Sequence, residues 1–251
     1  MIRISLGNVG SGKTASEVRE IMLNINQRKT YTNIRIKNTK QKNTHILKPE
    51  FIIKKQLVKT IQRRGGDLEP VYKQELNVEY WQELKEPINV VLDEAHSIIN
   101  SRRAMSKTNI VINDWLALIR RVLGQSEAGQ GDLVLITQLW NRIDNIARDM
   151  AHQIRYHICH YMKKCKHCGL VWHENSEHPE PLFICPECSS ISIKKYSHRI
   201  EIYKFAGMDA FINWKDYGMK TYYSRYIIND IETYFPNYNT LQWDNMFSQY
   251  Y

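Results

Sequence analysis

The feature that most constrains the fold is a glycine-rich run near the start of the chain, Gly7-Asn8-Val9-Gly10-Ser11-Gly12-Lys13-Thr14. It fits the P-loop pattern G-x-x-x-x-G-K-[ST] at every defined position. Apolar residues 2–6 precede the run and predict a short strand, and residues 15–25 follow with apolar side chains at helical spacing. A strand, this loop and a helix in succession predict an α/β fold in which the loop wraps around phosphate groups.

Each part of the loop has a role in binding a nucleoside triphosphate. The glycines at 7, 10 and 12 allow a tight turn, so that backbone N–H groups from Gly7 to Thr14 point at phosphate oxygens. The helix that follows adds the positive end of its dipole. We expect Lys13 to reach the β- and γ-phosphates and the Thr14 hydroxyl to bind Mg²⁺, with ATP as the nucleotide.

A second part of the same site is predicted at Asp93 and Glu94. Residues 88–92 are apolar and rich in β-branched side chains, which predicts a strand buried on both faces. The carboxylates follow where that strand ends, and open α/β sheets bind ligands at the carboxyl ends of their strands. Asp93 is expected to hold Mg²⁺ and Glu94 to polarise the attacking water. Residues 93–96 also spell a helicase box, but the chain after residue 160 lacks the second strand and helix series of such helicases.

A further buried strand is predicted over residues 132–136, and it ends in the polar pair Thr137 and Gln138. Gln138 should emerge at the same sheet edge as Asp93 and Glu94, where its amide can sense the γ-phosphate or orient water. The plainer alternative is a strand-end cap. Before this strand, residues 109–123 predict a helix with one apolar side.

Four cysteines predict a metal site that is chemically independent of the loop: Cys165, Cys168, Cys185 and Cys188. Their C-x₂-C-x₁₆-C-x₂-C spacing lies within the template of structural zinc sites, in which four thiolates close a tetrahedron around Zn²⁺. Disulfides are the alternative, and they are uncommon in a chain without a signal peptide. The fifth cysteine, Cys159, is expected to be a buried strand residue.

The cysteines also set the expected domain organisation. Residues 161–196 form a zinc ribbon inserted into a RecA-like ATPase core of mainly parallel sheet, made by residues 1–160 and 197–251. Such a ribbon can serve only to stabilise the fold, because so short a module cannot form a stable hydrophobic core without a bound metal. It can also contact DNA or a protein partner, and both roles stay open.

These motifs together resemble the FtsK/HerA superfamily of P-loop ATPases over residues 1–160. The resemblance rests on the P-loop, the acidic pair with an arginine soon after it, and the strand that closes in Thr137-Gln138. Within the superfamily the chain is most similar to small viral genome-packaging ATPases, and also to zonular-occludens-toxin-like phage assembly ATPases. The latter generally carry a membrane segment, and its absence here favours the packaging group.

The resemblance implies further properties of the chain. It implies a homo-oligomeric ring, usually a hexamer, with ATP at the subunit interfaces and an arginine supplied in trans to stabilise transition-state charge. By position, Arg120 or Arg121 matches the family arginine, and Arg148 is the second candidate. It also implies that residues 234–241 run across the neighbouring subunit.

Composition bounds the partners and the location. The chain carries 35 Lys and Arg against 26 Asp and Glu, a net charge of +9, which favours a polyanionic partner. Many of the basic residues lie within residues 35–64, either as a solvated face or as a surface for nucleic-acid phosphates. No apolar run reaches the about 18 residues of a membrane span. We therefore expect no anchor, no membrane partner, and a location in the host cytoplasm or the virion.

The sequence therefore predicts an ATPase that translocates DNA, double-stranded DNA in the simplest case, into a viral capsid, with capsid proteins as further partners. The alternative is a phage-assembly or secretion ATPase that acts on protein. A small-molecule kinase could use the same loop, but Glu94 argues against it because a water-activating carboxylate serves hydrolysis.

Overall fold

A central β-sheet organises the chain. The computed structural model describes residues 1–24, 27–37, 43–62, 65, 68–84, 86–99, 107–124, 131–177 and 183–239. Its strands are β1 (Ile2–Leu6), β2 (Lys29–Thr32), β3 (Thr44–Ile46), β4 (Ile53–Gln62), β5 (Leu68–Leu76), β6 (Ile88–Leu92), β7 (Leu133–Ile136), β8 (Gln153–Cys165), β9 (Val171–Asn175), β10 (Ile193–Phe205) and β11 (Ser224–Ile228). Its helices are α1 (Lys13–Asn24), α2 (Pro49–Ile52), α3 (Val78–Gln82), α4 (Ala95–Ile98), α5 (Lys107–Gly124), α6 (Asn145–Asp149) and α7 (Met208–Tyr217), with 3-10 segments η2 (Trp140–Arg142) and η3 (Ile231–Asn237).

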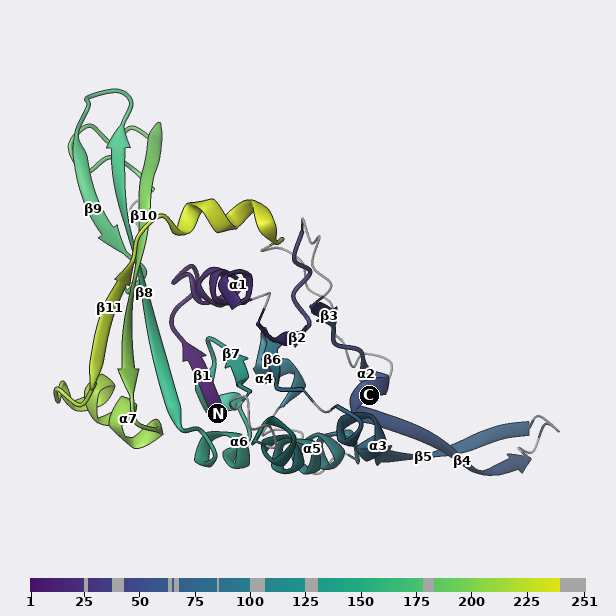
Figure 1. Cartoon of the computed structure of the whole chain (residues 1–251). Coiled ribbons are helices and arrows are strands. Elements are labelled where there is room, and N and C mark those ends of the chain that lie inside the picture. Colours follow the sequence, from purple (N-terminus) through teal and green to yellow (C-terminus); the bar gives the residue numbers. More distant parts are fainter. Residues whose placement is uncertain are drawn as a thin grey trace.

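The sheet is mainly parallel, as the sequence predicts. Within the described residues it has nine strands in the order β11-β10-β8-β1-β7-β6-β2-β3, with β9 paired to β8. All pairs from β8 to β3 are parallel. The antiparallel pairs are those of β10 with β8 and β11, and of β9 with β8. The predicted α/β class is therefore confirmed (Figure 1).

Side chains that alternate along the central strands bury both faces of the sheet. Val90 and Leu92 of β6 join the same apolar cluster as the α5 residues Trp115 and Ile119, whereas Val91 joins the cluster of α1. Figure 1 shows α1 on one side of the sheet and α5 on the other. This double burial explains why the strand sequences read as continuous apolar runs.

Buried charges fasten α1 to the sheet beneath it. Arg3 of β1 donates to Glu17 at 2.6 Å and to Glu20 at 3.0 Å, and the Ser5 hydroxyl donates to Glu17 at 2.6 Å. Arg155 of β8 pairs with Glu20 from the other side. Because Arg3 and Glu17 are buried, removing one of these two partners would leave the other charge buried with less compensation, which is costly. The network thus fixes α1, and with it the loop that precedes α1.

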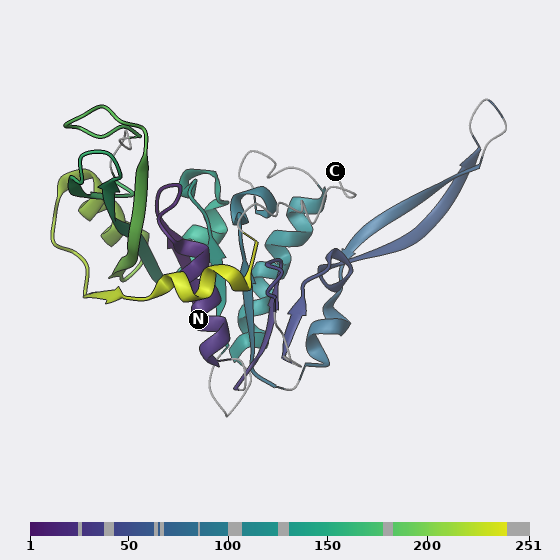
Figure 2. The ribbon, with the colours of Figure 1, turned by 90° about the horizontal axis from the view of Figure 1, so that it is seen from above.

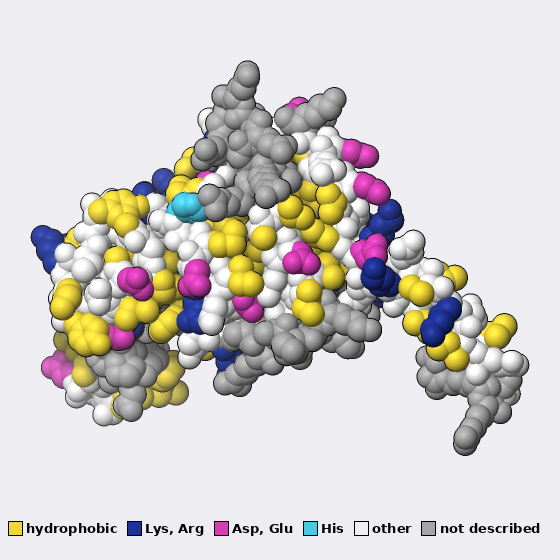
Figure 3. Space-filling view, turned by 90° about the horizontal axis from the view of Figure 1, so that it is seen from below, with side chains coloured by type: hydrophobic (Ala, Val, Ile, Leu, Met, Phe, Trp, Pro, Cys, Tyr) yellow, Lys and Arg dark blue, Asp and Glu magenta, His cyan; other side chains and the backbone are white. Residues whose placement is uncertain are grey.

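An antiparallel hairpin of β4 and β5 projects from the core as an arm (Figure 2). All of β4 after Ile53 is exposed, and the exposed residues include Leu57, Val58 and Lys59. Figure 3 shows apolar and basic side chains interspersed along it. Part of the basic stretch noted in the sequence, including Lys54, Lys55 and Lys59, therefore lies in an extended two-stranded arm.

The strands β8 and β10, with 13 residues each, are the longest of the described strands, and they carry the chain from the core to the cysteines (Figure 1). Their pairing runs from Phe205↔Ile154 in the core to Ile193↔Cys165 at the far end. The limit drawn at residue 160 on sequence grounds falls within β8. No helix in the described part of the chain is long and apolar enough to cross a membrane.

The segment after β11 packs against its own chain, and its predicted contact with a neighbouring subunit stays a prediction. Residues 231–239 pack on α1 of their own chain, with Ile231 and Tyr238 buried in the α1 cluster. Residues 240 and 241 lie outside the described residues. The described part of this segment therefore covers a face of its own chain.

Candidate active site

The P-loop lies between β1, which ends at Leu6, and α1, which begins at Lys13. Gly7 and Gly12 are needed for close packing: a Cβ on Gly7 would come within 2.6 Å of the His157 carbonyl oxygen, and one on Gly12 would overlap Ile200. Gly12 also has a φ of +84°, which side chains disfavour. The glycines of the motif therefore let the loop pack closely against β8 and β10.

Lys13 is directed back onto the loop. Its Nζ donates to the carbonyl oxygens of Gly7 at 2.8 Å and Asn8 at 2.9 Å. Burial lowers the pKa of Lys13, while the charges of Asp93 and Glu94 act in the opposite direction. An ammonium group at the centre of a phosphate-binding loop is placed to neutralise phosphate oxygens.

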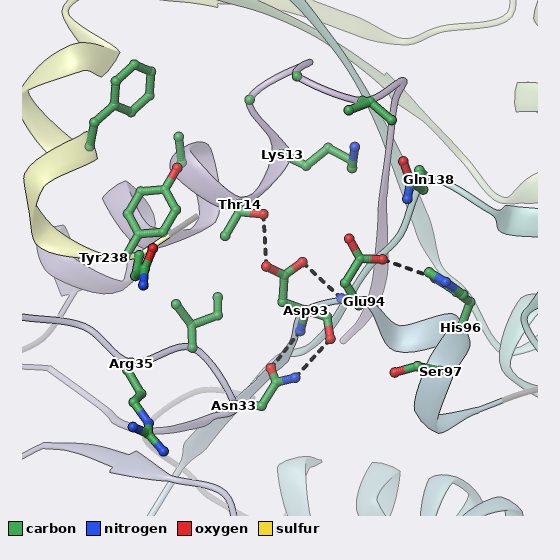
Figure 4. A pocket seen from close by; sticks show the side chains of 17 residues that line it. Lys13, Thr14, Asn33, Arg35, Asp93, Glu94, His96, Ser97, Gln138 and Tyr238 are labelled. Carbon is green, nitrogen blue, oxygen red and sulfur yellow. Dashed lines mark hydrogen bonds and ion pairs between the residues drawn. The ribbon is translucent and has the colours of Figure 1, made fainter. Parts of the chain in front are cut away.

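Thr14 and Asp93 converge at the carboxyl edge of the sheet (Figure 4). The Thr14 hydroxyl donates to Asp93 Oδ2 at 3.0 Å. The side chain of Asn33, which follows β2, holds the Asp93 backbone by accepting from its N–H at 2.7 Å and donating to its carbonyl at 2.9 Å. A hydroxyl and a carboxylate in contact are the oxygen donors that Mg²⁺ takes in nucleotide sites, so these two residues fit the ion that the sequence implies.

Burial makes the Asp93 carboxylate unusual. Desolvation raises the pKa of Asp93 from 3.8 to about 6, although the hydrogen bond from Thr14 and the charge of Lys13 oppose the shift. Such a carboxylate is ionised at neutral pH but destabilises the folded protein, because it has lost its hydration. A cation beside it would remove that penalty.

Glu94 has a left-handed backbone, with φ 49° and ψ 43°, and it precedes α4. A non-glycine residue in this conformation is uncommon and tends to mark a functional position. Its Oε2 lies 3.3 Å from Nδ1 of His96, which in turn lies 3.0 Å from the Thr137 hydroxyl. Burial raises the pKa of Glu94 and lowers that of His96, so the imidazole is neutral and lies beside the carboxylate while Nδ1 is hydrogen-bonded to Thr137.

A pocket of about 630 Å³ connects these groups. Gln138 follows β7 and lies on the same side of the pocket as Glu94, as Figure 4 shows. The pocket also includes residues that the sequence did not single out as site residues: Asn33, Ile34, Arg35, His96, Ser97, Phe235, Tyr238 and Asn239. Asn33 directly follows β2, so a strand predicted to end at residue 32 would have been a usable signal for it, whereas nothing in the local sequence marks the residues after 230.

Of the candidate arginines, Arg148 is the one whose side chain is described, and it is not among the described residues that line the pocket. Arg120 and Arg121 lie on α5, and their side chains lie outside the described part of the structure. Arg148, on α6, stacks on Trp140 with its Cζ 5.9 Å from the ring centroid and bonds to Asn145. Arg35, which the sequence grouped only with the basic run, does line the pocket.

His157 of β8 supports the P-loop from beneath and was missed from the sequence. Its Nδ1 donates to the Leu6 carbonyl at 3.0 Å, and its Nε2 lies 2.9 Å from the Ser16 hydroxyl. Burial lowers the pKa of His157 to about 3, so the ring stays neutral and accepts from Ser16 through Nε2. It therefore ties together the end of β1 and the first turn of α1, and only the three-dimensional pairing of β1 with β8 reveals this.

The four cysteines predicted as a metal site lie together at the far end of β8. Their Sγ atoms all lie within 4.8 Å of one another, with Cys165 and Cys188 3.6 Å apart and Cys168 and Cys185 3.5 Å apart. Four thiolates around Zn²⁺ at about 2.3 Å would stand about 3.8 Å apart. The group could therefore hold a metal ion of that size. Cys159 is buried and free, as predicted.

Fold and site together define an α/β P-loop protein with a phosphate-binding loop, a hydroxyl–carboxylate pair and an adjacent second carboxylate at one sheet edge. Residues 1–170 match the zonular occludens toxin (Zot) family, and the chain belongs to that family. The resemblance drawn from the sequence to P-loop ATPases of this kind is confirmed. No sequence match was found among curated proteins.

Two solved structures are similar to this chain. One is the N-terminal domain of zonular occludens toxin from Neisseria meningitidis, with 18% identity and a TM-score of 0.43 over 95% of this chain and 98% of that chain. The other is the genome packaging NTPase B204 from Sulfolobus turreted icosahedral virus 2, in complex with sulfate, with 15% identity and a TM-score of 0.34 over 62% and 72% of the two chains. At these TM-scores neither structure supports a functional assignment.

Proposed function

We propose that this chain hydrolyses ATP in the assembly of a phage or virus. The observation that carries the proposal is the contact between Thr14 and Asp93 at 3.0 Å, beside Lys13 of the P-loop and next to Glu94. Thr14 and Asp93 would hold Mg²⁺, which neutralises charge on the phosphate oxygens. Lys13 adds a second positive charge on the β- and γ-phosphates.

Glu94 is the residue placed to accept a proton from the attacking water. Its raised pKa makes it a stronger base than an ordinary glutamate, and the neutral His96 ring lies 3.3 Å from its carboxylate. Gln138, at the end of β7, orients the same water. An arginine from a neighbouring copy, with Arg120, Arg121 and Arg148 as the candidates, completes the site in a homo-oligomeric ring, for which we propose a hexamer.

DNA is the cargo that the charge distribution supports. The net charge is +9, and the exposed strand β4 carries Lys54, Lys55 and Lys59 along the arm. Basic side chains on a protruding ribbon can follow a phosphate backbone independently of sequence. An isolated two-stranded ribbon is only marginally stable in water, which supports contact between the arm and a partner or a second copy. The four-cysteine group is proposed to hold Zn²⁺ as a structural ion.

Membership of the zonular occludens toxin family supports a second candidate, an assembly ATPase whose cargo is protein. Duplex DNA separates the two candidates. A DNA translocase should hydrolyse ATP faster when duplex DNA is added at low salt, and the stimulation should fade as salt rises. If DNA did not change the ATPase rate and did not bind at low salt, the result would favour the candidate whose cargo is protein.

Two matched substitutions test the hydrolysis itself. Lys13→Ala should abolish ATP binding, because it removes the charge on the phosphates. Glu94→Gln should keep ATP binding and lose turnover by at least about 100-fold, since it removes only proton transfer. Calorimetric binding and phosphate release measure the two effects separately. Equal loss of binding in both variants would mean that the roles of the two residues are misassigned.

A further inference from the structure

The segment of residues 231–239, here termed the C-terminal strap, crosses α1 and ends beside the sheet. It leaves β11, runs over α1 and reaches the loop after β2, as Figures 1 and 2 both show. The guanidinium of Arg19 lies 6.0 Å from the ring centroid of Tyr234. At the far end Tyr238 forms a backbone bridge with Ile36. The strap is thus held both on α1 and at the sheet.

The strap forms one wall of the pocket that contains the P-loop. Phe235 and Tyr238 line this pocket together with Thr14. In Figure 4, Tyr238 lies on one side of the contact between Thr14 and Asp93, and Gln138 lies on the other. The pocket therefore has a polar end, at the carboxylates and Gln138, and an aromatic end at the strap.

The two ends fix the direction in which a nucleotide can lie. Lys13 and Glu94 mark the position of the γ-phosphate, so the α-phosphate and the nucleoside must extend toward the other end of the pocket. That end is formed by Ile34, Arg35 and the strap. Apolar and aromatic side chains with a few polar groups are the usual lining of a site for a flat heterocycle.

We propose that the C-terminal strap binds the base of the nucleotide, with the ring of Phe235 stacking on it. The inference rests on the proposed function, and it adds to that function the side chain that binds the base of ATP. Phe235 is only partly buried and lines the pocket, so part of its ring faces the site. The base offers a π-face, which stacks on an aromatic ring whatever its hydrogen-bonding edge.

Tyr238 supports this wall from within the fold. Its side chain is 5% exposed and packs in the α1 cluster. Burial, together with the nearby charge of Asp93, raises the pKa of Tyr238 to about 12. The phenol therefore stays neutral and adds no charge beside the carboxylate.

The test compares ATP with inorganic tripolyphosphate, which has the phosphates but no base. Both are titrated in the presence of Mg²⁺ against the wild-type chain, Phe235→Leu and Phe235→Trp. Phe235→Leu keeps an apolar side chain in the wall and removes the ring. Tyr234→Leu is the matched control, because it makes the same change at the neighbouring position, whose ring contacts Arg19 and lies outside the pocket lining.

Phe235→Leu is expected to weaken ATP binding by about tenfold, a factor within the measured range of base–aromatic stacking, and to leave tripolyphosphate binding unchanged. Phe235→Trp should retain ATP affinity, and Tyr234→Leu should resemble wild type with both ligands. Unchanged ATP binding in Phe235→Leu, or equal weakening of both ligands, would overturn the base site. If the wild-type chain bound neither ligand, the proposed function would be wrong, and so would the proposed base site.

Discussion

Replacing Asp93 with asparagine should stabilise the protein in the absence of ligand while removing its affinity for Mg²⁺. The substitution is nearly isosteric, and both hydrogen bonds of the carboxylate can be kept. The Glu94 N–H donates to Oδ1 at 2.9 Å, which an amide oxygen also accepts. The Thr14 hydroxyl, 3.0 Å from Oδ2, can rotate and accept from the amide N–H₂ instead of donating. The main change is therefore the loss of a buried negative charge.

The pKa of Asp93 gives the size of the effect. In the unfolded chain the carboxyl ionises near its ordinary pKa of 3.8, whereas in the folded protein the pKa is about 6. Each pKa unit corresponds to about 1.4 kcal/mol, so at neutral pH the buried charge destabilises the fold by about 3 kcal/mol. Below pH 6 the folded carboxyl takes up its proton, so the penalty falls to about 0.5 kcal/mol near pH 4 and vanishes below the pKa of the unfolded chain.

Asparagine carries no charge at any pH, so Asp93→Asn should gain stability over wild type only where Asp93 is ionised. The expected gain in the free energy of unfolding is at most about 3 kcal/mol near pH 7.5 and about 0.5 kcal/mol near pH 4. Lys13 loses an attractive neighbour in the variant, which makes the gain smaller than this limit. The same variant should lose the Mg²⁺-dependent part of its ATP affinity.

Urea unfolding in the presence of a chelator, at several pH values between these limits, measures the gain. Glu94→Gln is the matched control, because it also removes one carboxylate charge, at the adjacent position. The Glu94 side chain is 42% exposed, so this substitution should change the free energy of unfolding less. An Asp93→Asn variant that is less stable than wild type near pH 7.5 would refute the reasoning. A difference that does not vary with pH would refute it equally.

Two further predictions concern the frame around the site. Gly131→Ala should cost about 3 kcal/mol in urea unfolding, because the new Cβ would overlap the backbone carbonyl of Ile88. Gly218→Ala, where nothing lies near the new Cβ, should cost only the about 1 kcal/mol of its left-handed backbone, and equal costs would count against the clash. Cys185→Ser should lower the zinc content of the purified chain, measured by elemental analysis, whereas Cys159→Ser should retain it; bound zinc in both would place the ion elsewhere.

The parts of the site that the sequence predicts are those written in contiguous residues. The P-loop, the strand that ends at Asp93 and the strand that ends before Gln138 each combine an apolar run with polar residues at its carboxyl end. Because parallel strands bring such ends to one edge, local patterns were enough to predict that these residues meet there. The four cysteines were equally predictable, since zinc spacing is a local signal.

The parts that could not be predicted depend on pairing between distant segments. His157 is one of several polar residues in β8, and its role under the P-loop follows only from the pairing of Leu6 with Tyr156 in β1 and β8. Phe235 and Tyr238 read as ordinary packing aromatics, because their place in the pocket follows from the path of the strap across α1. The residues of the arm were interpreted as part of a basic stretch, because their apolar side chains did not indicate a buried element.

Strand β8 runs from the nucleotide site to the cysteine group, so the two sites share one continuous strand. The strand carries His157 beneath the P-loop and Cys165 in the metal group. Its partner β9 returns from the cysteines to Ser176, whose carbonyl accepts from the Asn8 side chain of the P-loop at 3.2 Å. The Ser176 hydroxyl also accepts from the Cys159 backbone N–H at 3.0 Å, which holds this return against β8. The cysteine group and the P-loop are therefore joined directly through β8 and through the hydrogen bonds of Ser176.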